Sequence, residues 1–326
     1  MIAMAQRSIP YAVARIRALE NRLLDAQTLA RLKDADRTDA LKLLLETGYG
    51  QGAAAEDAEA AIAAELLTAR RLVREVSPDP EVTGLFLLGI DARNLKTLLK
   101  ARLLNQSAEG LLGEGGMFPL ETLKRAVADK DYRDLPPEFS RELNAVERRL
   151  AVEPDPQMLS AAVDRAAFAY IDAVIRRSGD TFARSYFAAQ ADFLNVRSLL
   201  RARALGWDAE RLRRMLVSGG EISLDALADA LHQPDDQLSK RLASGANGRA
   251  IGAALEEYAA SGSLAGLERS MDAALMTLAR SAKAQSFSSG PVIGYLLGRE
   301  AEAKALRLIF AAKQAGREAS LPELYS

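Results

Sequence analysis

Acidic, amide and basic side chains recur in one fixed order at two places in this chain. The first place carries Asp91, Asn94, Lys96 and Arg102, and the second carries Asp192, Asn195, Arg197 and Arg203. A carboxylate accepts hydrogen bonds, an amide both donates and accepts them, and lysine and arginine donate to carboxylates or backbone carbonyls. The chemistry that this set supports is therefore hydrogen bonding and ion pairing.

A third, less similar copy lies near the C-terminus. It begins at Glu302, carries Arg307 in the basic position, and has Ala305 in the amide position. A spacing of roughly 100 residues is too long for one unit of an ordinary solenoid protein. The repetition instead predicts three related subdomains that arose by duplication. With boundaries at two glycine clusters, these subdomains are 1–113, 114–218 and 219–326.

The spacing within the first copy is that of one side of a helix, because residues three, four, seven, eight and eleven positions apart share a helical face. The residues on this face are Asp91, Asn94, Leu95, Leu98, Leu99 and Arg102. The leucines are predicted to belong to the core. The acid and the amide then have two interpretations. They satisfy backbone groups between helices, because a buried unpaired carboxylate is costly, or the repeated polar residues, above all the basic rows, contact a partner.

Helices must position these residues, because nearly every stretch of the sequence favours helix. Alanine, leucine, arginine and glutamate dominate, and the alternating pattern of strands is almost absent. Apolar residues at three- and four-residue spacing predict long helices within 53–76, 158–177 and 264–284. Pro78-Asp79-Pro80 should end the first, since proline cannot continue a helix, and Pro154-Asp155-Pro156 should open the second. The sequence thus predicts an all-α fold.

Composition excludes several classes of protein. The 326 residues include 43 basic and 44 acidic side chains, a balance that argues against a general nucleic-acid binder. The absence of cysteine excludes disulfides, thiol nucleophiles and cysteine-type zinc sites. The longest apolar runs, 85–90 and 292–297, are far shorter than the ~20 residues of a membrane-spanning helix. The mildly apolar stretch at the N-terminus, residues 1–5, has no basic segment before it. We therefore expect no signal peptide and a cytoplasmic location.

The motifs of common enzymes are missing. Gly113-Glu114-Gly115-Gly116 lacks the lysine and hydroxyl residue of a phosphate-binding loop, and no strand precedes a dinucleotide fingerprint. The single histidine, His232, excludes the zinc-protease motif, which needs two. We therefore expect a non-catalytic protein with no cofactor and no metal site. A helical enzyme that binds a diphosphate through magnesium at Asp235-Asp236 is an alternative, although it would need a second aspartate cluster.

An ordered set of segments resembles the C subunit of the V/A-type rotary ATPases of archaea and bacteria, whose eukaryotic vacuolar counterpart is the d subunit. The set consists of Tyr11-Ala-Val-Ala-Arg-Ile-Arg-Ala-Leu-Glu20-Asn-Arg-Leu-Leu24, then Glu46-Thr-Gly-Tyr-Gly50, and then the first and second copies of the repeated motif. No single segment is specific, whereas the ordered set is. The resemblance extends over essentially the whole chain, including its length.

The resemblance implies a non-catalytic subunit of the central rotor. Members of the family form a funnel of three similar helical subdomains about a pseudo-threefold axis, and we expect the same here. The partners would be the central stalk, made by the D and F subunits, and the membrane proteolipid ring. The chain would lie peripherally on the cytoplasmic face of the membrane, be monomeric in isolation, and pass torque between ATP hydrolysis or synthesis and ion transport.

A generic all-α adaptor or scaffold protein unrelated to ATPases is the main alternative, because it would share most of these sequence features. The two hypotheses differ in their partners. A rotor subunit should co-purify with other rotary ATPase subunits, and a generic adaptor should not.

Overall fold

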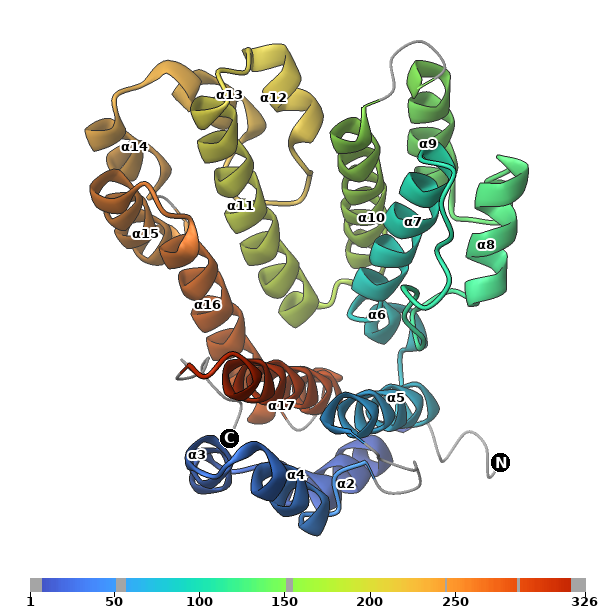
Figure 1. Ribbon diagram of the computed structural model, residues 1–326. Coiled ribbons are helices and arrows are strands. Elements are labelled where there is room, and N and C mark those ends of the chain that lie inside the picture. The colour runs from blue at the N-terminus through green and yellow to red at the C-terminus, as the bar shows by residue number, and fades with distance from the viewer. Residues whose placement is uncertain (1–7, 51–56, 151–154, 244, 286–287, 318–326) are drawn as a thin grey trace. The chain divides into compact units, whose positions relative to one another are not determined.

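The computed structural model describes residues 8–50, 57–150, 155–243, 245–285 and 288–317 (Figure 1). Within these ranges the elements are α-helices and one short 3₁₀ helix, and no strand is present. They are α2 (Ile9–Glu20), α3 (Ala26–Asp34), α4 (Arg37–Glu46), α5 (Ala58–Val76), α6 (Pro80–Leu85), α7 (Leu88–Leu103), α8 (Leu120–Asp129), α9 (Pro137–Leu150), α10 (Pro156–Ser178), α11 (Thr181–Ala204), α12 (Ala209–Met215), α13 (Leu224–Asp229), η1 (Ala230–His232), α14 (Asp235–Leu242), α15 (Gly248–Ser261), α16 (Ala265–Lys283) and α17 (Gly290–Gln314). The predicted all-α class is confirmed.

Proline and aspartate set helix ends where the sequence predicts them. Helix α5 ends at Val76, just before the first Pro-Asp-Pro segment. Helix α10 begins at Pro156, and the side chain of Asp155 accepts hydrogen bonds from the backbone N–H groups of Gln157 and Met158. A side-chain acceptor at this position pairs amides that have no partner within the helix. The local sequence is therefore enough to fix these two boundaries.

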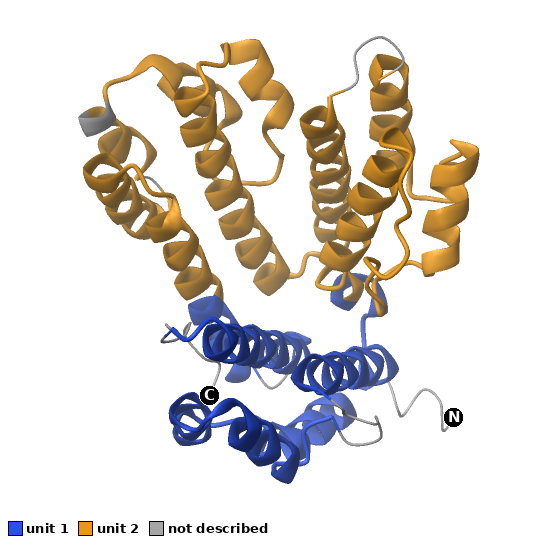
Figure 2. Ribbon diagram, viewed as in Figure 1, with its two compact units in different colours: residues 1–83, 276–326 blue, residues 84–275 orange. Residues whose placement is uncertain are grey.

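The chain divides into two compact units (Figure 2). The first combines residues 1–83 with residues 276–326, and the second is continuous from 84 to 275. Helix α16 begins in the second unit and ends in the first. The finer division into three subdomains at 113/114 and 218/219 stays a prediction.

In the first unit the C-terminal helix packs against the N-terminal helices. Helix α17, which is 25 residues long, contacts α2, α3, α4 and α5. Its buried side chains Ala303, Ala305, Leu306 and Ile309 share a core with Leu24, Leu29, Leu32, Ala40, Leu44, Tyr49, Ile62 and Leu66. Helices from the N-terminal and C-terminal parts of the chain thus share one hydrophobic core.

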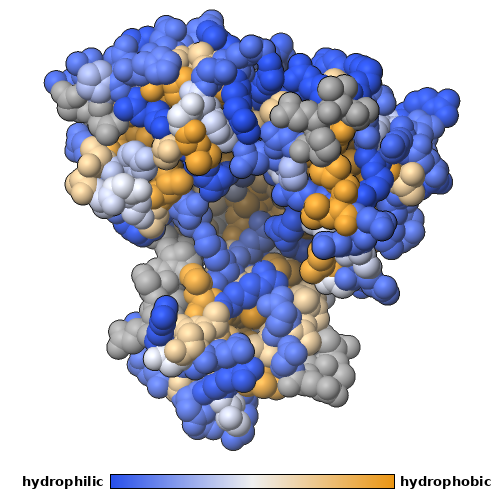
Figure 3. Space-filling model, turned by 45° about the horizontal axis from the view of Figure 1, so that its top comes forward, coloured by the Kyte–Doolittle hydropathy of each residue, from blue (hydrophilic) through white to orange (hydrophobic). Residues whose placement is uncertain are grey.

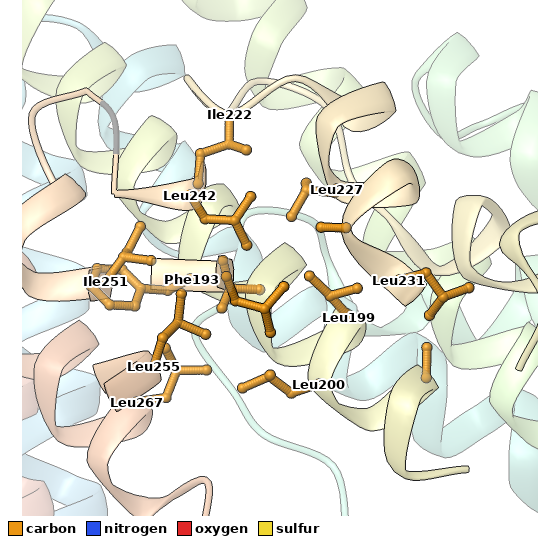
Figure 4. Close-up of a cluster of buried hydrophobic side chains, with 14 of the residues drawn as sticks. Phe193, Leu199, Leu200, Ile222, Leu227, Leu231, Leu242, Ile251, Leu255 and Leu267 are labelled. Carbon is orange, nitrogen blue, oxygen red and sulfur yellow. The ribbon is translucent and has the colours of Figure 1, made fainter. Parts of the chain in front are cut away.

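In the second unit, helix α10 packs against α9 and α7, and α7 packs against α8. Helix α11 contacts α12, α13 and η1, and α14 packs against α15. Figure 4 shows apolar side chains from several of these helices converging on one another. The residues labelled there are Phe193, Leu199, Leu200, Ile222, Leu227, Leu231, Leu242, Ile251, Leu255 and Leu267. Each fully buried side chain of this size contributes about 1.5–3 kcal/mol, so this cluster anchors α11.

Hydrophilic residues cover most of the molecular face shown in Figure 3, and hydrophobic residues form smaller patches between them. Over the described ranges, no helix combines the length and the apolar character that crossing a membrane requires.

Candidate functional site

The three copies of the repeated motif lie on three helices. The first copy (91–102) is on α7, the second copy (192–203) is on α11, and the third copy (302–313) is on α17. We call these three the motif helices. Each one carries its acid toward a different stretch of backbone, and the acid and the last basic residue make the same kind of contact in all three.

The acid of each of the first two copies is buried and accepts backbone hydrogen bonds from a following segment. Asp91 accepts from the N–H groups of Met117 and Phe118. Asp192 accepts from the N–H of Glu221 at 3.2 Å and from that of Ile222 at 3.0 Å. The exposed fractions are 0% for Asp91 and 1% for Asp192. A buried carboxylate requires such donors, because its lost hydration is otherwise uncompensated.

A glycine stands directly before the donating amides in both copies. A Cβ added to Gly116 would lie 2.2 Å from Oδ1 of Asp91, and one added to Gly220 would lie 2.2 Å from Oδ1 of Asp192. Neither distance is sterically possible. The absence of a side chain therefore lets the backbone approach the carboxylate closely enough to donate to it.

The amide position closes a second joint between the same two segments. Asn94 donates to the carbonyl of Gly113 and accepts from its N–H, both at 2.8 Å. Asn195 makes the same pair of bonds with Val217, at 2.9 and 2.8 Å. One asparagine thus replaces the two hydrogen bonds that a neighbouring backbone would supply. Ala305 of the third copy cannot do this, and it is instead fully buried in the apolar core.

The acid of the third copy joins the two ends of the chain. Glu302 accepts from the backbone N–H of Leu24, which precedes it by 278 residues. It also accepts from Arg299 Nη1 at 2.9 Å. Arg299 further pairs with Glu65 at 3.3 Å and donates to the hydroxyl of Tyr295 at 3.2 Å. Glu302 and Arg299 are 3% and 2% exposed, so this is a buried ionic cluster.

Burial changes the pKa values of two of these carboxyl groups. Burial raises the pKa of Glu302 to about 7, against the opposing effect of the positive charge on Arg299. The pKa of Asp192 is also raised, because the cost of its burial outweighs the hydrogen bonds from Ile222 and Glu221. In both cases desolvation disfavours the charged form more than the donors favour it.

The last basic residue of each copy caps the short helix that lies next to its motif helix. Arg102 donates to the carbonyl of Val127 at the end of α8. Arg203 donates to three carbonyls around η1, those of Ala230 (3.1 Å), Leu231 (2.9 Å) and Gln233 (2.6 Å). Lys313 of the third copy donates to the carbonyls of Lys33 and Ala35 at the end of α3. Cationic side chains stabilise a helix C-terminus by pairing its free carbonyls.

The middle basic position differs between the copies. Lys96 pairs with Asp164 of α10 at 2.5 Å, and Arg307 pairs with Glu59 of α5 through its Nε and Nη2 atoms. The side chain of Arg197 has no ion pair or hydrogen bond with any described residue. Its pKa is lowered, first by burial and then by the neighbouring Arg201. The second copy therefore holds a half-buried arginine that is attracted by Glu268 and Asp164 but forms no ion pair with either of them.

Taken together, the polar residues of the copies form joints between helices, and the described residues contain no group of three or more acidic or histidine side chains able to hold a metal ion. The side chains of Asp235 and Asp236 lie outside the described residues. A role of the repeated residues in contacting a partner stays a prediction.

Sequence reasoning missed the residues that serve the joints from outside the motif. The sequence predicts Gly116 and Gly220 only as parts of loops, although a glycine cluster follows the acid at a similar distance in both copies. Nothing in the sequence marks Arg299 as part of the site, because the corresponding positions of the other two copies hold Leu88 and Ala189. Its role depends on Glu65, which is far away in the sequence.

Nearly the full chain is similar to known proteins of one family. The family described as ATP synthase (C/AC39) subunit matches residues 12–323. The A-type ATP synthase C subunit of Methanothermobacter thermautotrophicus is 26% identical over 96% of this chain and 85% of its own length. The corresponding protein of Methanocaldococcus jannaschii is 27% identical over 93% and 83%. The V-type sodium ATPase C subunit of Enterococcus hirae is 23% identical over 92% of each chain.

These matches confirm the resemblance that the ordered motifs indicate, and with it the prediction of a non-catalytic subunit of an ATP-driven or ATP-synthesising complex. They also remove the hypothesis of an adaptor unrelated to ATPases. Because the family match extends over nearly the full length, the chain belongs to the ATP synthase (C/AC39) subunit family.

Proposed function

We propose that this chain is the part of the rotor that connects the central stalk, made by the D and F subunits, to the membrane proteolipid ring. Torque then passes through it between ATP hydrolysis or synthesis and ion transport. The observation that carries the proposal is the family match over residues 12–323. In this assembly the chain lies peripherally on the cytoplasmic face of the membrane, and it is monomeric when isolated.

The proposed architecture is a funnel of three helical subdomains about a pseudo-threefold axis. Support comes from the repeated contacts, since each motif helix binds backbone groups through its acid and caps a short helix through its last basic residue. The same plan in three copies is what duplication of one subdomain would produce. Ala305 marks the polar position at which the third copy has lost the contact.

The proposed role requires a stiff protein. Moving one charge against 100 mV takes about 2.3 kcal/mol. A subunit that couples the transport of several charges to one ATP must therefore transmit torque without deforming. Exposed ion pairs contribute little to this stiffness, because each stabilises the fold by only about 0–1 kcal/mol. Buried and fully paired groups such as Asp192 and Asn195 resist more, because opening them leaves polar atoms without partners.

A pull-down from gently solubilised membranes of the native host tests the proposal. The tagged chain should recover a proteolipid together with stalk and catalytic subunits of a rotary ATPase, identified by mass spectrometry. Dissociating the ring beforehand should remove the proteolipid while leaving the stalk subunits bound. Host membranes that lack the chain should hydrolyse ATP without building an ion gradient.

Two results would contradict the proposal. One is recovery of the tagged chain only with proteins unrelated to rotary ATPases. The other is normal ATP-driven ion transport in membranes that lack the chain, because a rotor without its connecting piece cannot transmit torque. Restoring the gradient with a plasmid-borne wild-type chain is the matched control.

A further inference from the structure

The middle basic residue of the second copy lacks the ion pair that the corresponding residue forms in the other two copies. In the first and third copies this residue pairs with a carboxylate on a neighbouring long helix, Asp164 on α10 or Glu59 on α5. Arg197 of the second copy has no such partner among the described residues. The position is the same in all three helices, so the difference is that neither carboxylate near Arg197, Glu268 or Asp164, forms an ion pair with it.

The surroundings of Arg197 add positive charge. Arg201 lies one turn further along α11, is exposed, and its side chain has no hydrogen bond or ion pair with any residue that the structure describes. Like charges four residues apart on a helix repel each other. The carboxylates that attract Arg197 are Glu268 and Asp164, and neither forms an ion pair with it. Asp164 is held by Lys96 at 2.5 Å.

A half-buried guanidinium that forms no ion pair or hydrogen bond is costly, because the attraction of Glu268 and Asp164 does not offset its lost hydration and the repulsion from Arg201. Replacing Arg197 with a neutral residue would relieve both this cost and the repulsion from Arg201. Sequences keep such a locally unfavourable feature most readily where a partner compensates for it.

The other two copies show what fits the position. There the occupant is a carboxylate carried by a helix that lies against the motif helix. Acidic residues three or four positions apart on one helix have Cβ atoms about 5–6 Å from each other, and the same separation applies to Arg197 and Arg201, which are four positions apart on α11. Arginine binds a carboxylate through two parallel hydrogen bonds. The chemistry that completes the second copy is therefore an acidic helix.

We infer that Arg197 and Arg201 form a docking site for an acidic helix of the central stalk, which supplies to the second copy the carboxylates that Asp164 and Glu59 supply to the others. This inference rests on the proposed function, because it takes the partner from that assembly. An open position in one of three copies gives a repeated protein one distinguishable side, so that the stalk binds in one orientation rather than in three.

The test measures binding of the purified full-length chain to the isolated stalk subcomplex and, separately, to the detergent-solubilised ring. Arg197→Gln combined with Arg201→Gln should weaken stalk binding about tenfold or more and reduce its dependence on salt. The matched control is Arg148→Gln with Arg149→Gln, two exposed arginines at the end of α9 that have no ion pair among the described residues. The control should bind within about twofold of wild type, because distant exposed charges act weakly. Thermal unfolding should show no loss of stability in the Arg197→Gln variants.

A second pair of variants keeps the test decisive if the glutamine variant folds poorly. Arg197→Lys with Arg201→Lys retains both charges and introduces amines that a carbodiimide joins to adjacent carboxylates. Cross-links from these positions to acidic residues of a stalk helix are expected, and none are expected from Arg148→Lys with Arg149→Lys.

The outcomes separate the two claims. If wild type binds the stalk and the glutamine variant binds equally well, the docking site is wrong and the proposed function stands. If the variant loses affinity only for the lipid-containing ring, headgroup phosphates rather than a stalk helix occupy the site, and the inference is also overturned. If wild type binds neither preparation, the proposed function itself fails, and the inference fails with it.

Discussion

At the scale of single residues, each joint depends on a carboxylate that is buried and on backbone that can come close to it. Asp91 and Asp192 have glycine beside the donating amides, whereas the third copy has Leu23 before Leu24 and the longer acid Glu302. The amide of Asn195 adds two bonds that a shorter or apolar side chain cannot make. These side chains connect the motif helices to neighbouring backbone through hydrogen bonds between residues far apart in the sequence.

The glycine beside Asp91 gives a direct test. Gly116→Ala should lower the free energy of unfolding by about 2–4 kcal/mol, because its Cβ would collide with the carboxylate and separate Asp91 from its donors. Gly89→Ala is the matched control, since no atom lies within 4 Å of a Cβ at that position of α7. The control should be neutral or stabilising by up to about 1 kcal/mol. Urea denaturation measures both, and equal effects would contradict the steric explanation.

The buried cluster around Glu302 predicts a pH dependence of stability. The ordinary pKa of 4.5 applies to the unfolded chain, and the folded value is about 7. Between these values the folded state holds an extra proton. The contribution to stability is thus complete below pH 4.5 and is lost as the pH rises through 7, and it amounts to about 3 kcal/mol at most.

Glu302→Gln should therefore flatten the fall in unfolding free energy between pH 5 and pH 8, because the amide does not titrate. Urea denaturation at several pH values measures the slope. Glu59→Gln is the control, since Glu59 is an exposed partner of Arg307 and should leave the slope unchanged. The same slope in Glu302→Gln and wild type would show that another group causes the dependence.

At the scale of elements, each motif helix stabilises a short helix near it in space. Helices α3, α8 and α13 have only 9, 10 and 6 residues, and isolated helices shorter than about 12 residues are marginal in water. The cations Arg102, Arg203 and Lys313 pair the carbonyls at or just beyond the C-terminal ends of these helices. The order of the short helices thus depends on the motif helices rather than on their own propensity.

Arg203→Met tests this dependence, because methionine keeps an apolar stem and removes the donors to three carbonyls around η1. We expect a loss of about 2–3 kcal/mol in unfolding free energy, with faster amide hydrogen exchange in α13 and η1. Arg201→Met should do neither, since the side chain of Arg201 is exposed and forms no hydrogen bond with a described residue. Unchanged exchange in α13 would mean that the cap does not order this helix.

At the scale of the whole molecule, the compact units do not follow the order of the chain. The first unit needs residues 1–83 and 276–326 together, and the contact of Glu302 with Leu24 spans 278 residues. The second unit is one continuous segment. Folding of the first unit must therefore wait for the last part of the chain to be synthesised, whereas the second unit is complete earlier.

Fragments should show this asymmetry. Residues 84–275 alone should be helical and unfold cooperatively, because their core is internal to the segment. Residues 1–83 alone should be largely unfolded, because their core lacks Leu306 and Ile309, and adding residues 276–326 in trans should restore helicity. Circular dichroism and thermal unfolding measure both. A stable, cooperative 1–83 fragment would contradict the shared core.

The sequence by itself determined the helices and the repeated motif, because both are local. Periodic apolar residues, proline and the spacing between Asp91 and Asn94 act over a few turns, and the all-α class and the family follow from them. The partners of the motif were decided by the tertiary structure alone. Each donor lies 19 or more residues from its acceptor, and the path of the intervening chain selects it. For the same reason, the pairing of Lys96 and the lack of a described partner at Arg197 cannot be read from two nearly identical stretches of sequence.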